Sequence, residues 1–303
     1  MFDKMERADR IATRSYTAGI VKSHDFRIKK GYGQNFLTDQ HVLGKIINAA
    51  DIKDDELVIE IGPGIGALTQ ELAERAKSVA AVEIDKALIP VLAETLAGYD
   101  NVEIINADIL KINIRDIIAR HNKKSAKVIA NLPYYITTPI VMGLLEQGQN
   151  VDSIVVMVQK EVALRMTAKP GTKDYGSLSL AVQFYSEPSL VANVPANCFF
   201  PRPNVDSAVI KLDVLEKPSV DVKDSELMFK IIRAAFSKRR KTLVNCLEGS
   251  DQWSVVSGQF SKADIEAILV SCGLPLMVRG ESLGLEAFAR LADAVAYPKG
   301  QQQ

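Results

Sequence analysis

The run Asn131-Leu-Pro-Tyr134 carries groups that could hold a nucleobase amine at the end of an apolar segment, residues 127–130. The side-chain oxygen of Asn131 and a backbone carbonyl such as that of Leu132 could each accept one N–H bond of an exocyclic amine. Two acceptors would aim the nitrogen lone pair at a methyl donor, which is catalysis by positioning and electrostatics. Pro133 would restrict the loop, and Tyr134 could stack on the base. The run alone also fits a strand-ending turn with a buried tyrosine.

A glycine-rich turn lies upstream, in Glu60-Ile-Gly-Pro-Gly-Ile-Gly66. Gly62, Gly64 and Gly66 would let the backbone turn sharply and let a ligand approach where a Cβ would clash. A helix starting near Ala67 would point its free N–H groups at that ligand. The glycines are spaced more tightly than in the dinucleotide-binding pattern, which favours S-adenosylmethionine over NAD. A tight turn that binds nothing is the alternative interpretation.

Acidic residues follow the next two apolar runs. Glu83, in Val82-Glu-Ile-Asp85, lies about 20 residues after the glycines and could accept hydrogen bonds from both ribose hydroxyls of an adenosine. Asp108 could accept one from the adenine amino group of the cofactor. Each acid alone could be an ordinary solvated strand end. Together with the glycines they place a ligand at the carboxyl ends of the strands, where open α/β sheets bind theirs.

Short apolar runs alternate with helical patterns over residues 40–185 and would position these groups. The runs are too short and too continuously apolar for exposed hairpins, and they suit buried parallel strands at 57–61, 79–84, 102–105, 127–130 and 154–158. The helical patterns lie at 40–50, 67–75, 86–96, 114–119, 139–146 and 160–167. This alternation predicts an open, doubly wound, Rossmann-like α/β sheet. Two further runs, 190–194 and 207–214, could form an antiparallel pair at one edge.

The pattern changes after Leu215. A linker-like stretch begins at residue 216, and beyond it only helical periodicity appears, at 227–247, 262–271 and 285–296. Ser261 and Asp264 have the form of a helix N-cap. We therefore predict a flexible N-terminal tail of mixed charge at 1–30, a cofactor-binding domain at 31–215 and a small all-helical domain at 216–303. The residues from Pro298 are predicted to be disordered.

The composition is that of an ordinary globular chain of 303 residues, with 47% hydrophobic residues and a formal net charge of zero. There is no global bias toward nucleic acid, so any polyanion site must come from local clustering. Three separated cysteines predict reduced thiols, and three scattered histidines do not suggest a metal site. No apolar run is long enough to span a membrane, and the N-terminus does not resemble a targeting signal. A cytoplasmic location is expected.

Basic residues gather in the predicted helix at 227–247. They include Lys230, Arg233 and the four-residue run Lys238-Arg239-Arg240-Lys241, with no acid between them. A basic helix face is often only solvated, but a four-residue run is hard to explain by helix amphipathicity. We expect this run to contact RNA phosphates, with salt-sensitive binding.

Taken together, the chain resembles the ribosomal RNA small-subunit adenine N6-dimethyltransferases, the family of the kasugamycin-sensitivity methyltransferase. The resemblance extends from about residue 30 to beyond residue 247. Besides the motifs above, it rests on Gly33-Gln-Asn-Phe-Leu37, Gln159-Lys-Glu-Val162, Tyr175-Gly-Ser-Leu178, Phe199-Phe-Pro-Arg-Pro-Asn-Val-Asp-Ser207 and Phe236-Ser-Lys-Arg-Arg-Lys-Thr-Leu243. Relatives vary at Phe200-Pro-Arg202, a departure that does not affect the chemistry.

The resemblance implies a class I S-adenosylmethionine methyltransferase sheet followed by a helical RNA-binding domain. It implies cofactor contacts at Asn35, Leu37, Gly62, Glu83, Asp108 and Asn131, to which the glycine turn adds Gly64. It also implies that Tyr134 and Phe199 sandwich the adenine. A proline-rich turn follows Phe199, so we expect an exposed ring there. Gln34 and Asn35 supply amides that could reach the methionine end of the cofactor or cap a helix.

The implied reaction is dimethylation of N6 on two adjacent adenosines in a small-subunit (16S) rRNA hairpin loop near the 3′ end. The implied partner of this enzyme, expected to be a monomer, is the 30S precursor particle, with a role in small-subunit biogenesis. An erythromycin-resistance-type enzyme, which modifies large-subunit rRNA, is the alternative enzyme. A non-catalytic assembly factor and a small-molecule methyltransferase are alternatives from other classes, and the latter explains neither the basic residues nor the helical domain.

Overall fold

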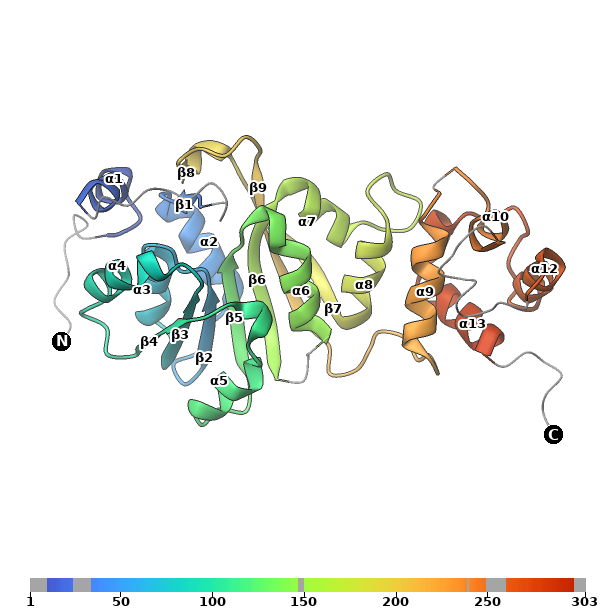
Figure 1. Ribbon diagram of the computed structural model, residues 1–303, viewed down its shortest axis with the longest axis horizontal. Helices are drawn as coiled ribbons and strands as arrows, with labels where there is room; N and C mark the ends of the chain where they lie inside the picture. Colours follow the sequence, from blue (N-terminus) through green and yellow to red (C-terminus); the bar gives the residue numbers. More distant parts are fainter. Residues whose placement is uncertain (1–9, 24–33, 147–149, 239, 249–259, 297–303) are drawn as a thin grey trace. The chain divides into compact units, whose positions relative to one another are not determined.

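The computed structural model describes residues 10–23, 34–146, 150–238, 240–248 and 260–296 (Figure 1). The chain divides into two compact units. The first comprises residues 1–163 and 187–216, and the second comprises residues 164–186 and 217–303. Residues 164–186, which the sequence places in the cofactor-binding domain, therefore group with the C-terminal helices.

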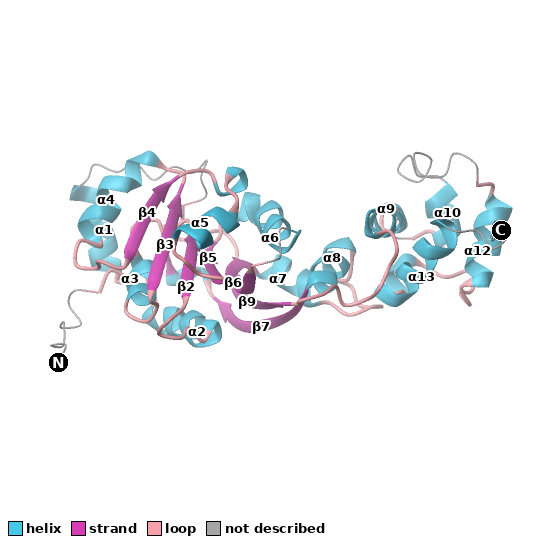
Figure 2. Ribbon diagram, turned by 90° about the horizontal axis from the view of Figure 1, so that it is seen from below, coloured by secondary structure: helices cyan, strands magenta, loops and turns pink. Residues whose placement is uncertain are grey.

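Among the described residues, seven strands form the main sheet of the first unit, in the order β4-β3-β2-β5-β6-β9-β7 (Figure 2). Their bounds are β2 Leu57–Ile61, β3 Ser78–Glu83, β4 Val102–Asn106, β5 Ala126–Asn131, β6 Val151–Gln159, β7 Ser186–Val194 and β9 Ser207–Val214. The strands β2 to β6 pair in parallel, whereas β9 runs antiparallel to β6. The predicted α/β sheet is confirmed, and β9 and β7 complete it at one edge.

Helices cover both faces of this sheet, with α2 on one side and α5 and α6 on the other (Figure 2). Valine and isoleucine side chains from β2, β3, β5 and β6 pack with α2, α3 and α4 in one buried cluster. The bounds are α2 Gln40–Ala50, α3 Ala67–Ala73, η3 Lys86–Leu88, α4 Ile89–Thr95, η4 Ile109–Lys111, α5 Ile114–Arg120, η5 Tyr134–Ile136, α6 Thr137–Glu146, α7 Lys160–Thr167 and η6 Ala196–Cys198. The start of α2 is set by Asp39, whose carboxylate accepts the Val42 N–H at 3.0 Å.

The described part of the N-terminal region is ordered, so the prediction of a flexible tail is wrong for residues 10–23. Helix α1 spans Arg14–Ser23, and Ile11 before it is 1% exposed. The Ile11 N–H donates to the side-chain oxygen of Gln70, and Arg10 forms ion pairs with Glu71 and Glu74 at 3.0 and 2.7 Å. Burial of its apolar side chains explains why this segment docks on α3. The remainder of the predicted tail, and the end of the chain from residue 298, lie outside the described residues.

A small antiparallel sheet joins β1, Phe36–Leu37, to β8, Phe199–Phe200. Phe36 is opposite Phe200, and Leu37 is opposite Phe199. Strands of two residues have no periodicity that a sequence can show, so these two were not predicted. Their pairing fixes the residues just before α2 against a segment roughly 160 positions away.

The second unit is helical in the residues described, with its own core. Its elements are α8 Ser177–Tyr185, α9 Ser225–Ala235, α10 Leu243–Glu248, α12 Lys262–Ser271, η7 Gly280–Ser282 and α13 Leu285–Ala296. The predicted helices at 262–271 and 285–296 and the Ser261 cap are confirmed. Helix α8 was not predicted, since its apolar residues alternate with small and polar ones. Buried Tyr175 precedes it and donates its hydroxyl to the Leu283 carbonyl at 2.8 Å.

The expected single helix at 227–247 is two helices, so that prediction is corrected. Helix α9 ends at Ala235 and α10 begins at Leu243. Between them the Lys241 N–H donates to the Lys238 carbonyl in a turn. Thr242 directly precedes α10, and its carbonyl accepts the Cys246 N–H in the first turn of that helix. Lys238, Arg240 and Lys241 of the predicted basic run therefore lie between two helices and not on one helical face.

If residues 10–23 belong to the folded unit, replacing Ile11 by alanine should lower the free energy of unfolding by about 2–4 kcal/mol, because it removes buried methylenes and leaves a cavity. Urea denaturation followed by circular dichroism would measure this change. Leu190→Ala, at a side chain 42% exposed on β7, is the control and should change stability much less. Equal effects of the two substitutions would contradict the docking of this segment.

Candidate active site

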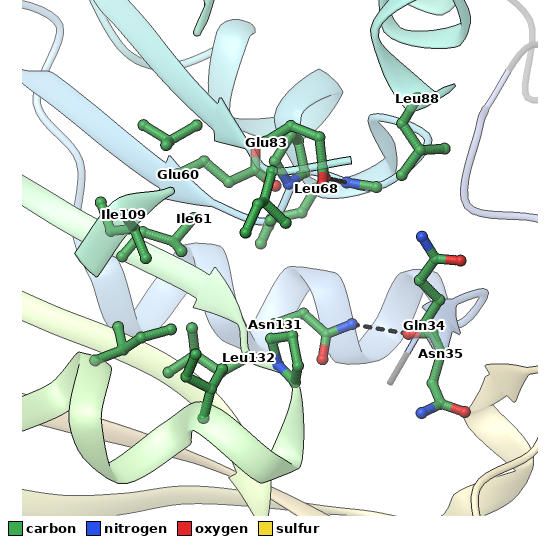
Figure 3. A pocket seen from close by; sticks show the side chains of 18 of the residues that line it. Gln34, Asn35, Glu60, Ile61, Leu68, Glu83, Leu88, Ile109, Asn131 and Leu132 are labelled. Carbon is green, nitrogen blue, oxygen red and sulfur yellow. Dashed lines mark hydrogen bonds between the residues drawn. The ribbon is translucent and has the colours of Figure 1, made fainter. Parts of the chain in front are cut away.

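A pocket lies at the carboxyl ends of the parallel strands (Figure 3). Strand register brings these ends together, because Ile61 pairs with Val82 and Ala130, and Glu83 pairs with Asn106. The predicted site residues that line the pocket are Asn35, Leu37, Gly62, Gly64, Glu83, Asp108, Asn131, Leu132, Pro133 and Tyr134. Phe199 does not belong to the lining.

The glycine turn after β2 is built on positive φ angles, which only glycine adopts without strain. The φ angles are +69° at Gly62, +63° at Gly64 and +92° at Gly66. At Gly64 a Cβ would also lie 3.0 Å from the ring of Phe36, so a side chain there would crowd that ring in addition to straining the backbone. The turn therefore keeps its backbone open to the pocket.

Glu83 closes this turn from the neighbouring strand. One of its oxygens accepts the Gly64 N–H at 3.2 Å, and the other accepts the Asp85 N–H at 2.8 Å. Burial raises the pKa of Glu83, while these backbone donors oppose the rise. A carboxylate has about four acceptor positions, so these backbone donors leave room for a hydrogen bond from a ligand in the pocket. Glu83 thus shapes the glycine turn and faces the pocket at once.

Glu60 is a second carboxyl group in the pocket lining. Its side chain is 1% exposed, and its Oε2 has no hydrogen-bond partner among the described residues. Burial, together with the nearby Glu83 carboxylate, raises the pKa of Glu60 to about 8, although the Thr69 hydroxyl acts in the opposite direction. A buried polar atom without a partner indicates a group that a ligand, proton or water must satisfy.

Asp108 lies between the end of β4 and the start of η4. Its Oδ1 accepts the Leu110 N–H at 3.1 Å and caps that short helix. Its Oδ2 is 3.9 Å from the ammonium of Lys111. The helix cap fixes the carboxylate at the pocket wall and leaves acceptor positions for an amine or hydroxyl of a ligand.

Asn131 ends β5, and a hydrogen bond from its side chain orients the amide. Its Nδ2 donates to the backbone carbonyl of Asn35 at 3.0 Å (Figure 3). The amide N–H₂ is therefore directed at the segment that leads into β1, and Oδ1 is the group left as an acceptor. Leu132 follows with 1% exposure, and its N–H is bonded to the Met157 carbonyl. The backbone that carries Asn131 is thus held by the next strand of the sheet.

The two predicted stacking residues lie in different environments. Tyr134 lines the pocket and is partly buried, and burial raises the pKa of its hydroxyl. Phe199 is 1% exposed and packs in the hydrophobic core, opposite Leu37. The expectation of an exposed ring at Phe199 is wrong, because pairing of β8 with β1 buries it. Its contact with a target base stays a prediction.

Several lining residues were not singled out from the sequence. Apolar side chains form much of the wall, among them Ile61, Leu68, Ile84, Leu88 and Ile109. Ile84 is 46% exposed, whereas the acids on either side of it, Glu83 and Asp85, are buried. The position of Ile84 just after a strand could have indicated that it lines the pocket. The sequence predicts that the Gln34 amide either contacts the cofactor or caps a helix. In the structure this amide donates to the Asp85 carboxylate at 3.1 Å.

The predicted RNA-contact residues lie in the second unit. Lys238, Arg240 and Lys241 are exposed in the turn between α9 and α10, and Arg239 lies outside the described residues. In the part of the chain that is described, no group of histidine, cysteine and acidic side chains could hold a metal ion. No described helix is long and apolar enough to cross a membrane.

Comparisons with known proteins show which family the chain resembles. The family model described as ribosomal RNA adenine dimethylase matches residues 25–263. The ribosomal RNA small subunit methyltransferase A of Lachnoclostridium phytofermentans is 56% identical over 92% of this chain and 95% of the relative. That of Geobacillus kaustophilus is 49% identical over 94% of this chain and 97% of the relative.

Two solved structures are similar in fold. A dimethyladenosine transferase from Plasmodium falciparum has a TM-score of 0.71 at 29% identity, over 84% of this chain and 95% of that one. The 23S rRNA methyltransferase ErmE has a TM-score of 0.66 at 27% identity, over 87% of this chain and 100% of that one. Both likenesses span most of this chain.

The raised pKa of Glu60 should make the ligand-free protein less stable as pH rises. The unfolded carboxyl titrates near 4.5 and the folded one near 8, so between these values only the folded state keeps the proton. The free energy of unfolding should then fall by up to about 1.4 kcal/mol per pH unit. Glu60→Gln should abolish this slope and be more stable than the parent at pH 8. Urea denaturation from pH 5 to pH 8 measures it.

The matched control is Glu187→Gln, at an exposed glutamate on β7. This substitution should leave the pH slope as it is in the parent protein. Identical pH profiles for Glu60→Gln and the parent would contradict a protonated Glu60.

Proposed function

The chain belongs to the ribosomal RNA adenine dimethylase family, and from that premise we propose that it dimethylates N6 of two adjacent adenosines in a small-subunit rRNA hairpin loop near the 3′ end. The observation that carries the proposal is the oriented amide of Asn131 at the pocket. The high identity of relatives named small subunit methyltransferase A supports the choice of subunit.

The methyl donor we propose is S-adenosylmethionine, which supplies an activated methyl group on a sulfonium. Glu83 would accept from the ribose hydroxyls and Asp108 from the adenine amine. Gly62 and Gly64 offer the backbone approach that a nucleoside requires, with the other contacts at Asn35 and Leu37. Among the described residues, the pocket lining carries acidic groups and no basic side chain, which suits a cofactor with a positive centre.

The target amine would be held by the strand-end loop. With its N–H₂ engaged by Asn35, Asn131 can present only Oδ1 to an amino group, and a carbonyl of the loop such as that of Leu132 would accept the second N–H. These bonds would keep the N6 lone pair directed at the methyl group. A carbon–nitrogen bond forms as the carbon–sulfur bond breaks, and the N6 proton leaves to solvent. Tyr134 would stack on the base and Pro133 would keep the loop rigid.

The polyanionic partner would be small-subunit rRNA in a 30S precursor particle, which gives the protein a role in small-subunit biogenesis. The exposed cations of the turn between α9 and α10 support phosphate contact by the second unit. A base in an RNA loop can swing out of the stack and enter an active site. A base paired inside a duplex cannot be reached in this way without first being unstacked. We further propose that the protein acts as a monomer in the cytoplasm.

Replacing Asn131 by alanine should lower turnover by about 100-fold or more, because it removes the acceptor that polarises the amine. Isolated, undermethylated 30S and 50S subunits incubated with methyl-labelled S-adenosylmethionine measure the activity, and mass mapping locates the modified adenosines. Asn48→Ala, at an exposed asparagine of α2, is the control and should remain fully active. Label confined to 50S subunits would overturn the proposal in favour of the large-subunit enzyme.

The double substitution Arg240→Ala and Lys241→Ala should weaken RNA binding at every sequence tested. Removal of each phosphate-binding cation should reduce the slope of log affinity against log salt by about 0.7–0.9. Filter binding of a small-subunit rRNA fragment between about 50 and 300 mM salt, a range around physiological ionic strength, measures the slope. The control removes the same charge elsewhere in the second unit, as Lys217→Ala with Lys262→Ala. Equal weakening in both double variants would contradict a specific role for the turn.

A further inference from the structure

The hydroxyl of Tyr134 and the hydroxyl of Ser207 lie 2.7 Å apart. The two residues are 73 positions apart in the chain, and they belong to the loop after β5 and to the first position of β9. Strand β6 separates β5 from β9 in the sheet (Figure 1). The hydrogen bond therefore reaches across one strand, from the antiparallel strand β9 to the loop of the pocket.

Ser207 is placed rigidly for this contact. It is 0% exposed, and it pairs with Gln159 at the end of the β6–β9 ladder. A buried hydroxyl costs free energy unless it is hydrogen-bonded, so the bond to Tyr134 matters to both residues. Ser207 itself does not line the pocket, whereas Tyr134 does.

The contact determines where the Tyr134 ring can lie. The backbone of Tyr134 is held in the short helix η5, in which the Ile136 N–H and the Thr137 hydroxyl both bond to the Pro133 carbonyl. A tyrosine side chain attached only at its Cα can still rotate about two torsions. A hydrogen bond at the far end of the ring fixes the first torsion, and with it the direction of the ring axis, because the hydroxyl oxygen lies on that axis. Tyr135, the next residue, is 60% exposed, so its ring is less enclosed by the protein than the ring of Tyr134.

We propose that Ser207 is a positioning residue that holds the Tyr134 ring at the place where it stacks on the target adenine. This inference rests on the proposed function, since it assigns Tyr134 to the base and not to the methyl donor. Ser207 touches neither substrate nor cofactor in this role. It acts by keeping the stacking surface ready before RNA binds, so that the ordering cost is not incurred at the step of binding.

The role predicts a split between the two substrates. Ser207→Ala should lower kcat/KM for the rRNA substrate about 3- to 10-fold, the factor that corresponds to one ordinary hydrogen bond. The dissociation constant for S-adenosylmethionine, measured by calorimetry on the purified protein, should change by less than about 2-fold, a change too small to correspond to the removal of a hydrogen bond. A general loosening of the fold would move both constants together.

The experiment is a double-mutant cycle on the full-length protein with Ser207→Ala, Tyr134→Phe and the two combined. Both single variants break the same bond from opposite sides, so the double variant should be no less active than the more impaired single variant. The control is Ser153→Ala, at the other end of the β6–β9 ladder. Ser153 is 4% exposed, and its hydroxyl has no partner in the described part of the chain, so kcat/KM should not change.

Two outcomes would overturn the inference alone, with the wild-type protein active on 30S subunits. One is a double variant whose loss of kcat/KM equals the product of the losses in the two single variants. The other is a rise in the dissociation constant for S-adenosylmethionine by the same factor as the loss of kcat/KM. Circular dichroism of each variant shows whether it is folded, so that a loss of activity caused by unfolding is not mistaken for one of these two outcomes. If the wild type labels no 30S rRNA, the proposed function fails, and the assignment of Tyr134 to a base fails with it.

Discussion

The parallel register of β2, β3, β4 and β5 is the constraint on which the site depends. Within the strands the backbone groups are bonded to their neighbours, so a ligand can meet only the residues just beyond the strand ends. A slip of one residue in any pair would turn its side chains to the opposite face. The contact of Glu83 with the glycine turn and that of Asn131 with Asn35 both require the register to be correct.

The two buried carboxyl groups show how the surroundings assign a charge. Glu83 receives a backbone N–H on each oxygen, and these donors favour the ionised form. Glu60 has no such donor on Oε2 among the described residues, so it holds its proton at neutral pH. Neighbouring acids in one pocket are thereby kept from repelling each other. Glu83 and Asp108 lie on successive strand ends.

Much of the first unit could be predicted because its signals are local. The strands β2 to β6 are continuous apolar runs, and Glu83, Asp108 and Asn131 follow directly from where those runs end. Helix α8 was missed because its alternating pattern does not have the period of a helix. The break before Thr242 was missed because the apolar spacing continues across it. The burial of Phe199 depends on pairing with β1, and no local pattern carries that information.

The small β1–β8 sheet has a consequence for how the protein folds during its synthesis. The Asn35 carbonyl that orients Asn131 belongs to a segment whose partner strand lies roughly 160 residues later. Contacts between such distant segments form slowly, because a long loop must close before they contribute. During synthesis the chain emerges from its N-terminal end, so the pocket cannot be complete until Phe199 and Ser207 have left the ribosome. About two thirds of the chain must therefore be synthesised before the β1–β8 pair can form.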